Sequence, residues 1–186
     1  MTPRGTCAVP LLFLYNMDMD KIFAIKYIDA LYFQQGDQKY TGLKTYVAIG
    51  KAIIRENCLI LYFREQANGT PIEGLVLPRE AIVFEQDNNK VVKNKEVLSY
   101  PQKGSDVGIY WTDIVHFENN QMPEEPTAMY TEGKLMEEFN NSVMIEKPKT
   151  LKIKGVLSEN HPKNIEPELC VIPKSLINDI EVYGNK

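Results

Sequence analysis

The sequence predicts a mainly β fold, with small, strongly bent barrel-like or sandwich-like sheets. Apolar runs of strand length, such as Cys58 to Phe63, alternate with turn residues along most of the 186-residue chain. Asn68-Gly69 predicts a hairpin turn, because both residues tolerate a positive φ angle. An apolar run followed by Pro and a basic residue also recurs, which favours strands that turn a sharp corner.

Three segments share this strand-corner-strand pattern. They are residues 74–85, 107–118 and 169–181. The first and last have Pro78 and Pro173 at the corner, and the middle one has Tyr110 there. Proline cannot donate a ladder hydrogen bond, so both prolines should lie at a bend or a sheet edge. A structural repeat and a chance similarity between short patterns are both open explanations.

The corner at Pro78 and Pro173 is similar to the end of small SH3-like and Sm-like barrels. The shared features are an aliphatic residue, Pro, a basic residue and, after two more positions, Ile. The similarity covers about a dozen residues and concerns the fold rather than membership of a family. Barrels of this kind bind peptides, nucleic acid or copies of themselves, so the resemblance implies a binding role.

Composition shifts divide the chain into four parts. We expect an N-terminal tail or edge strand over 1–16, a main β domain over 17–120, a linker with a short helix over 121–142, and a C-terminal β segment over 143–186. The C-terminal segment either completes the barrel or forms a small second unit.

One short helix is predicted near residues 131–141. Its N-cap and apolar stripe would be formed by Thr131, Leu135, Met136 and Phe139. Two other stretches, 21–33 and 46–56, fit either a strand or a helix. Residue propensity favours a strand in the first of them.

Composition and charge exclude several classes of function. The net charge of −4 argues against broad, sequence-independent DNA binding, which needs many Lys and Arg contacts to phosphate. The three cysteines, Cys7, Cys58 and Cys170, are far apart, as in proteins of a reducing compartment. The apolar stretch 8–15 lacks a signal-peptide cleavage site, and no run approaches the roughly 18 apolar residues of a membrane span. We therefore expect a cytoplasmic protein without a membrane partner.

The sequence contains no recognisable catalytic or cofactor-binding motif. Its two histidines, His116 and His161, have no partner His or Cys at ligand spacing. A Gly-rich phosphate loop, a nucleophile elbow and a dinucleotide fingerprint are also absent from the sequence. We therefore predict no catalytic residue, no metal ligand and no cofactor, and expect a non-enzymatic role.

An alternative enzyme hypothesis rests on carboxylates. Asp113 followed by Glu132-Gly133-Lys134 resembles the aspartate and the acid-x-Lys triplet of the PD-(D/E)xK nuclease superfamily. The resemblance implies that both carboxylates hold Mg²⁺ and that the lysine orients the attacking water or stabilises charge. In that family the triplet ends a hydrophobic strand, whereas here it opens the predicted helix.

An aromatic surface patch is the first candidate binding site. Tyr110 and Trp111, the only Trp in the chain, lie near His116 in the sequence, and aromatic residues are enriched at binding surfaces. The alternative is that Trp111 fills the core, as a lone Trp in a strand usually does. In the leading hypothesis, the protein is an adaptor, inhibitor or immunity-type partner from a bacterium or phage. It would bind another protein, or a copy of itself, through a β-sheet surface.

A Lys-rich C-terminal face is the second candidate. Lysines crowd residues 147–163, and Lys152 and Lys154 are the candidate binding residues within this stretch. A nucleic-acid-binding regulator would place these charges against phosphate groups. A strand edge that lysines protect from aggregation would give the same pattern.

Overall fold

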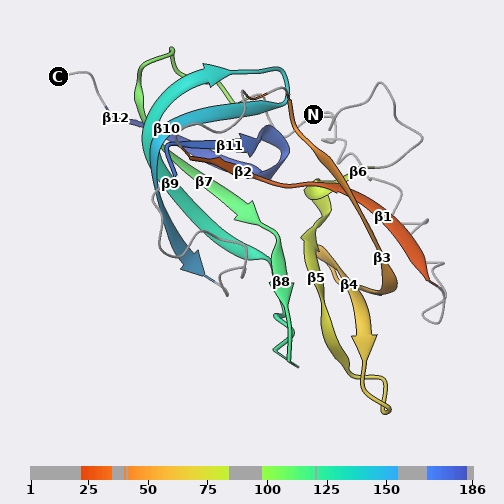
Figure 1. Cartoon of the computed structure of the whole chain (residues 1–186). Helices are drawn as coiled ribbons and strands as arrows, with labels where there is room; N and C mark the ends of the chain where they lie inside the picture. Colours follow the sequence, from red (N-terminus) through yellow and green to blue (C-terminus); the bar gives the residue numbers. More distant parts are fainter. Residues whose placement is uncertain are drawn as a thin grey trace, which may run out of the picture.

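The computed structural model describes residues 22–34, 40, 42–83, 98–119, 121–154 and 167–183. These residues form two strongly curved, six-stranded antiparallel sheets (Figure 1). The predicted mainly β, sandwich-like class is therefore confirmed. Within the described part of the chain, each sheet has two free edges and neither closes into a barrel.

The first sheet has the strand order β6-β1-β3-β4-β5-β8. Its strands are β1 (Phe23–Ile28), β3 (Thr45–Ile54), β4 (Cys58–Glu65), β5 (Pro71–Pro78), β6 (Ile82–Val83) and β8 (Val115–Phe117). Strand β3 shows that the stretch 46–56 is mainly a strand. Its exposed residues Val47 and Ile49 alternate with more buried ones, which is the two-residue period of a strand.

The second sheet has the strand order β12-β7-β9-β10-β11-β2. Its strands are β2 (Leu31–Phe33), β7 (Asp106–Asp113), β9 (Thr127–Glu138), β10 (Ser142–Lys154), β11 (Leu169–Pro173) and β12 (Ile177–Tyr183). Strands β1 and β2 show that residues 23–28 and 31–33 of the stretch 21–33 are strands, as their propensity favours, and that the two strands belong to different sheets.

The two halves of the chain repeat the same plan. Adding six to each label of the order β6-β1-β3-β4-β5 gives β12-β7-β9-β10-β11, which is the order in the second sheet. The register also repeats, because Tyr27 pairs with Ile82 in the first sheet and Trp111 pairs with Ile177 in the second. The chain therefore contains two structural repeats, β1–β6 and β7–β12, and the corner segments 74–85 and 169–181 hold equivalent places in them.

Pro78 and Pro173 form the same corner in the two repeats. Each ends a strand and precedes one 3₁₀ turn, η1 (Arg79–Ala81) or η2 (Lys174–Leu176). The φ angles of the prolines are −55° and −59°, within the range that the pyrrolidine ring imposes. The two turns contact each other, so these corners also join the two repeats.

The middle segment, 107–118, is a crossover between the sheets and differs from the two proline corners. Strand β7 of the second sheet ends at Asp113, and the chain continues as β8 in the first sheet. The first repeat does the reverse: β1 belongs to the first sheet, and after Asp29 the chain continues as β2 in the second. Each repeat therefore contributes one three-residue strand to the sheet of the other.

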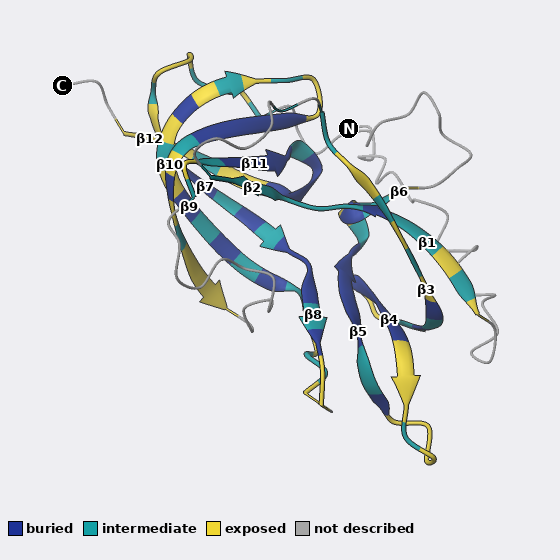
Figure 2. Ribbon diagram, viewed as in Figure 1, coloured by how far each residue is buried: buried dark blue, intermediate teal, exposed yellow. Residues whose placement is uncertain are grey.

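The apolar interior is shared by both repeats. The cluster around β4 and β5 includes Ile114 and Leu176 from the second repeat. In the second sheet Trp111 is completely buried, and its indole Nε1–H donates to the Thr131 hydroxyl at 2.9 Å. A buried indole N–H needs such an acceptor. Figure 2 shows buried residues along β5, β7 and β11 and exposed residues at the far end of the β4–β5 hairpin.

The predicted helix near 131–141 is wrong, because this segment is the second half of β9 and the turn into β10. Thr131 and Leu135 are buried while Met136 is 40% exposed, and burial along β9 follows the period of a strand. Strands β7 and β10 pair with β9 on its two sides, and this tertiary pairing outweighs helical propensity. The Thr131 hydroxyl, expected to cap a helix, instead accepts the buried indole hydrogen bond.

Strands of the expected main domain (17–120) and of the expected C-terminal segment (143–186) share the second sheet. There β7 pairs with β12 and β2 pairs with β11. The expected N-terminal tail or edge strand, 1–16, lies outside the described residues. The domain boundaries themselves stay a prediction.

Replacing Trp111 by Ala should destabilise the protein by about 3–5 kcal/mol, because it removes a fully buried large side chain. Urea unfolding followed by far-UV circular dichroism measures this loss. Val47→Ala, at an exposed position of β3, is the control and should change the free energy of unfolding by less than about 0.5 kcal/mol. Equal losses in the two variants would contradict the buried position of the indole.

Candidate functional site

The outer surface of the second sheet carries a row of aromatic and aliphatic side chains. In β7, Ile109 and Trp111 point into the core, so Tyr110 between them points outward. Tyr110 pairs with Tyr130 in β9, and Tyr130 pairs with Leu151 in β10. Directly paired residues share one face of an antiparallel sheet. The side chains of Tyr110, Tyr130 and Leu151 therefore lie next to one another across three strands.

Tyr183 of β12 extends this row into a continuous surface, here termed the tyrosine face (Tyr110, Tyr130, Leu151 and Tyr183). The ring centroids of Tyr110 and Tyr130 lie 4.7 Å apart, and the hydroxyl groups of Tyr130 and Tyr183 are hydrogen-bonded. Leu151 is 62% exposed and Tyr183 is 42% exposed. Gly108 permits this arrangement, because a Cβ atom at its position would collide with the Tyr130 ring.

Two glutamates bind the tyrosine hydroxyls. Tyr110 and Tyr183 donate to the two carboxylate oxygens of Glu181, at 3.2 Å and 3.0 Å. The Tyr130 hydroxyl, whose single proton also serves the hydrogen bond with Tyr183, lies 3.3 Å from a carboxylate oxygen of Glu132. Desolvation and the hydrogen bond with Tyr183 raise the pKa of Tyr130, so its hydroxyl is protonated at neutral pH. The tyrosine face thus combines apolar rings with hydrogen-bonding groups around them.

A shallow hollow of about 440 Å³ adjoins the tyrosine face beside Tyr183. Its lining includes charged side chains of both signs, among them Glu132, Lys134 and Lys147. Lys147 has a φ of +48° and lies where the register of β10 shifts against β9, at a bulge. Charged side chains thus border the tyrosine face at this hollow.

The predicted aromatic binding residues do not converge on one site. Tyr110 lies on the tyrosine face, whereas Trp111 lies in the core, which was the alternative for this residue. His116 lies in β8 of the first sheet, where it pairs with Leu75. Successive residues of a strand point to opposite sides, so a surface patch cannot contain both Tyr110 and Trp111.

Lys152 and Lys154 lie near the end of β10, and both are exposed. The Nζ atom of Lys154 lies 2.9 Å from a carboxylate oxygen of Glu125. Lys149, in the same strand, pairs across the sheet with Glu132. Acidic neighbours thus offset part of the positive charge on this strand, and nucleic-acid binding by the Lys-rich face stays a prediction.

Asp113 and Glu132, the carboxylates of the nuclease hypothesis, lie on opposite sides of the second sheet. Asp113 is buried, whereas Glu132 is exposed on the outer surface. Asp113 pairs with Thr127 and Glu132 pairs with Gly108, so the two carboxylates are also about 17 Å apart along the strands. They cannot bind one Mg²⁺ ion together with Lys134. Among the described residues, no cluster of three or more His, Cys, Asp or Glu can hold a metal ion.

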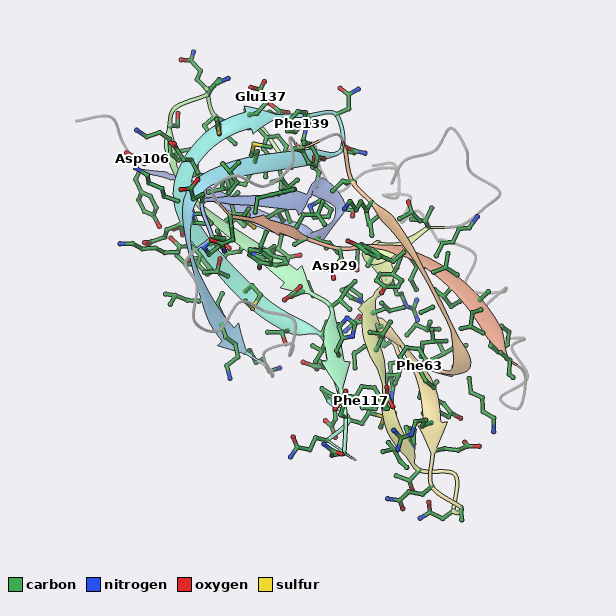
Figure 3. All side chains as sticks on the ribbon, viewed as in Figure 1. Asp29, Phe63, Asp106, Phe117, Glu137 and Phe139 are labelled. Carbon is green, nitrogen blue, oxygen red and sulfur yellow. The ribbon has the colours of Figure 1, made fainter. Side chains whose placement is uncertain are left out.

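A pair of aspartates at the crossovers is a feature that the sequence analysis does not predict. Asp113 is buried at the end of β7, and the partly buried Asp29 holds the equivalent position after β1. Each accepts the backbone N–H of the next residue, Ala30 at 2.8 Å and Ile114 at 3.0 Å. Figure 3 shows Asp29 between the two sheets. The available signal was an aromatic-x-Asp-x-aliphatic pattern, present at 27–31 and at 111–115.

Burial makes both aspartates harder to ionise, and the charge of Asp29 adds to this effect at Asp113. Desolvation raises the pKa of Asp29 to about 6, and desolvation together with the charge of Asp29 raises the pKa of Asp113 well above its usual range. The hydrogen bond from the following backbone N–H is the contribution that lowers each pKa. The titratable side chains that share this environment all have raised pKa values and are neutral at pH 7: Tyr27, Tyr32, Tyr46 and Cys170.

Comparisons with protein-family models, with curated proteins and with solved structures find no match. In the part of the chain that the structure describes, no helix has the length and apolar character needed to cross a membrane. A cytoplasmic location stays a prediction. The fold and the chemistry of the surface are therefore the basis for a functional proposal.

Replacing Asp113 by Asn should stabilise the protein at neutral pH. A carboxyl group with a raised pKa in the folded state stabilises folding fully below its unfolded pKa of about 4, and this contribution is lost as the pH rises through the folded pKa. Relative to Asp113→Asn, the wild-type free energy of unfolding should therefore fall as the pH rises from about 4 to about 8. Urea unfolding at a series of pH values measures the difference.

Asp106→Asn, at an exposed position of β7, is the matched control for this measurement. Its free energy of unfolding should follow that of the wild type across the same pH range. A constant difference between Asp113→Asn and the wild type at all pH values would show that the two aspartates do not share a desolvated environment.

Proposed function

We propose that this chain is a non-enzymatic interaction protein that binds another protein through the tyrosine face, in an adaptor, inhibitor or immunity-type role. The observation that supports this proposal is the tyrosine face itself, in which three tyrosine rings and an exposed leucine lie on the outside of a sheet. Tyrosine is enriched at protein interfaces, because its rigid ring buries a large area and its hydroxyl forms hydrogen bonds.

The support beneath the tyrosine face favours binding with little loss of entropy. Strands β7 and β9 pair without a break from Asp106 to Asp113. On the inner side, Trp111 and Thr131 connect the same two strands by a buried hydrogen bond. On the outer side, Glu181 accepts hydrogen bonds from two of the tyrosines. A surface that is ordered before binding loses less conformational freedom when its partner arrives.

The outer surface of the first sheet provides a comparison. Val47 and Ile49 pair with β1 in the same register in which Tyr130 and Glu132 pair with β7. They therefore hold the equivalent positions in the first sheet. Val47 is 57% exposed and Ile49 is 62% exposed. These two positions carry aliphatic side chains, so they lack the mixed ring and hydroxyl chemistry of Tyr130 and its neighbours on the tyrosine face.

Partner capture followed by mutation tests the proposal. The tagged full-length chain should retain a protein from an extract of the source cells, and the purified partner can then be titrated by calorimetry. Tyr110→Ser combined with Leu151→Ser should weaken binding of this partner at least tenfold, or about 1.4 kcal/mol, because central aromatic and aliphatic contacts carry most of the binding energy of an interface.

Val47→Ser combined with Ile49→Ser is the matched control, since it removes two exposed apolar side chains from the first sheet. The control variant should bind the partner within about twofold of the wild type, and urea unfolding should show that both variants fold. If the control loses binding while the tyrosine-face variant binds normally, the first sheet carries the interface and the proposal is wrong.

A further inference from the structure

Among the described strands, β12 forms one edge of the second sheet. It lies at the end of the strand order, and among the described strands it pairs with β7 alone. The other edge strands, β2, β6 and β8, contain two or three residues, whereas β12 contains seven. An edge strand leaves backbone N–H and C=O groups unpaired on one side, and an added strand can pair with them.

The side chains of β12 alternate in chemistry between the two faces of the sheet. Asp179 and Glu181 pair with outward-facing positions of β7, so both carboxylates point to the outer surface. Ile180 and Val182 pair with inward-facing positions and point the other way. A strand added beside β12 would therefore meet acidic residues on its outer side and apolar residues on its inner side.

The two carboxylates of β12 form no ion pair among the described residues. The glutamates in ion pairs with Lys or Arg in the described part of the chain lie elsewhere: Glu65, Glu73, Glu125, Glu137 and Glu138. Glu181 accepts tyrosine hydroxyls, and Asp179 accepts the backbone N–H of Ile180 at 2.9 Å. Val182 is 55% exposed. The edge thus presents two negative charges and an exposed apolar side chain.

A second copy of the chain does not complement this edge. Symmetric antiparallel pairing of two β12 strands, centred on residue 179, 180 or 181, brings Asp179 or Glu181 opposite an acidic residue of the other copy. Like charges directly opposite each other destabilise a sheet. The charge pattern therefore favours a partner strand with basic residues.

We propose that β12 binds an extended segment of a partner protein in which basic and apolar residues alternate. The segment adds to the second sheet as a further strand, with Lys or Arg opposite Asp179 and Glu181 and apolar side chains opposite Ile180 and Val182. The added strand continues the outer surface beside the tyrosine face. This inference rests on the proposed function and specifies the chemistry of the partner.

A short synthetic peptide of alternating Lys and Val residues tests the inference. Titrated into the ¹⁵N-labelled full-length protein at about 0.15 M salt, it should bind saturably and shift the backbone amide signals of residues 177–183. A peptide with Glu in place of Lys should bind at least tenfold more weakly. Two N-methylated versions, methylated at alternate backbone nitrogens in either phase, test for backbone pairing. One version should lose binding at least tenfold and the other should retain it, because only every second N–H faces the sheet.

Glu181→Lys should weaken binding of the Lys-Val peptide at least tenfold. Glu56→Lys is the matched control, because it makes the same change in net charge at an exposed position between β3 and β4. It should change the affinity by less than about twofold, since exposed charges beyond the Debye length are screened. Equal effects of the two variants, or equal binding of both N-methylated peptides, would reduce the contact to unspecific charge attraction and overturn the inference.

The two proposals can fail separately. If the Lys-Val peptide does not bind while a partner is captured through the tyrosine face, the edge inference is wrong and the proposed function stands. If the peptide binds at β12 but mutation of the tyrosine face leaves partner binding unchanged, the proposed function is wrong and the edge inference stands. A wild-type dimer that is detected by sedimentation and lost in Val182→Pro would show that a second copy occupies the edge, and would also overturn the inference.

Discussion

The exchange of β2 and β8 between the two repeats is the constraint on which the rest of the structure depends. Each is a three-residue strand that pairs with the sheet of the opposite repeat, β2 with β11 and β8 with β5. Strands this short are not stable alone, so each forms only when the other repeat is folded. The apolar core also depends on both repeats, since Ile114 and Leu176 of the second repeat pack into the cluster of the first. The two repeats should therefore unfold as one cooperative unit.

The crossovers explain why carboxylates lie between the sheets. A chain that leaves one sheet for another interrupts the ladder of backbone hydrogen bonds, and a freed N–H group needs an acceptor. Asp29 and Asp113 supply this acceptor, because a short Asp side chain reaches the neighbouring backbone. The consequence is two acidic groups in one desolvated region, each with a raised pKa. The two carboxyl groups at the crossovers therefore make the free energy of unfolding lower at neutral pH than at acidic pH.

The sequence predicts features that depend on local chemistry and misses those that depend on distant pairing. Pro78 and Pro173 act on their own backbone, so both corners could be predicted, and so could the mainly β class. The crossovers could not, because Leu31 pairs with Val171 far along the chain. The same limit applies to the helix near 131–141, where pairing with two other strands decides the conformation. For the tyrosine face, Tyr110 was identified, but its neighbours depend on the register of strands that the sequence does not specify.

Comparison of the two repeats separates the residues that the fold requires from those that it does not. Inward positions keep their character, as Ile82 and Ile177 do after the two proline corners. Outward positions change, since Val47 of the first repeat corresponds to Tyr130 of the second. A fold that accepts an aliphatic residue in one repeat does not need a tyrosine in the other. Architecture therefore does not account for the tyrosine face, whereas the proposed contact with a partner would, because tyrosine rings and hydroxyls stabilise an interface more than they stabilise an exposed strand.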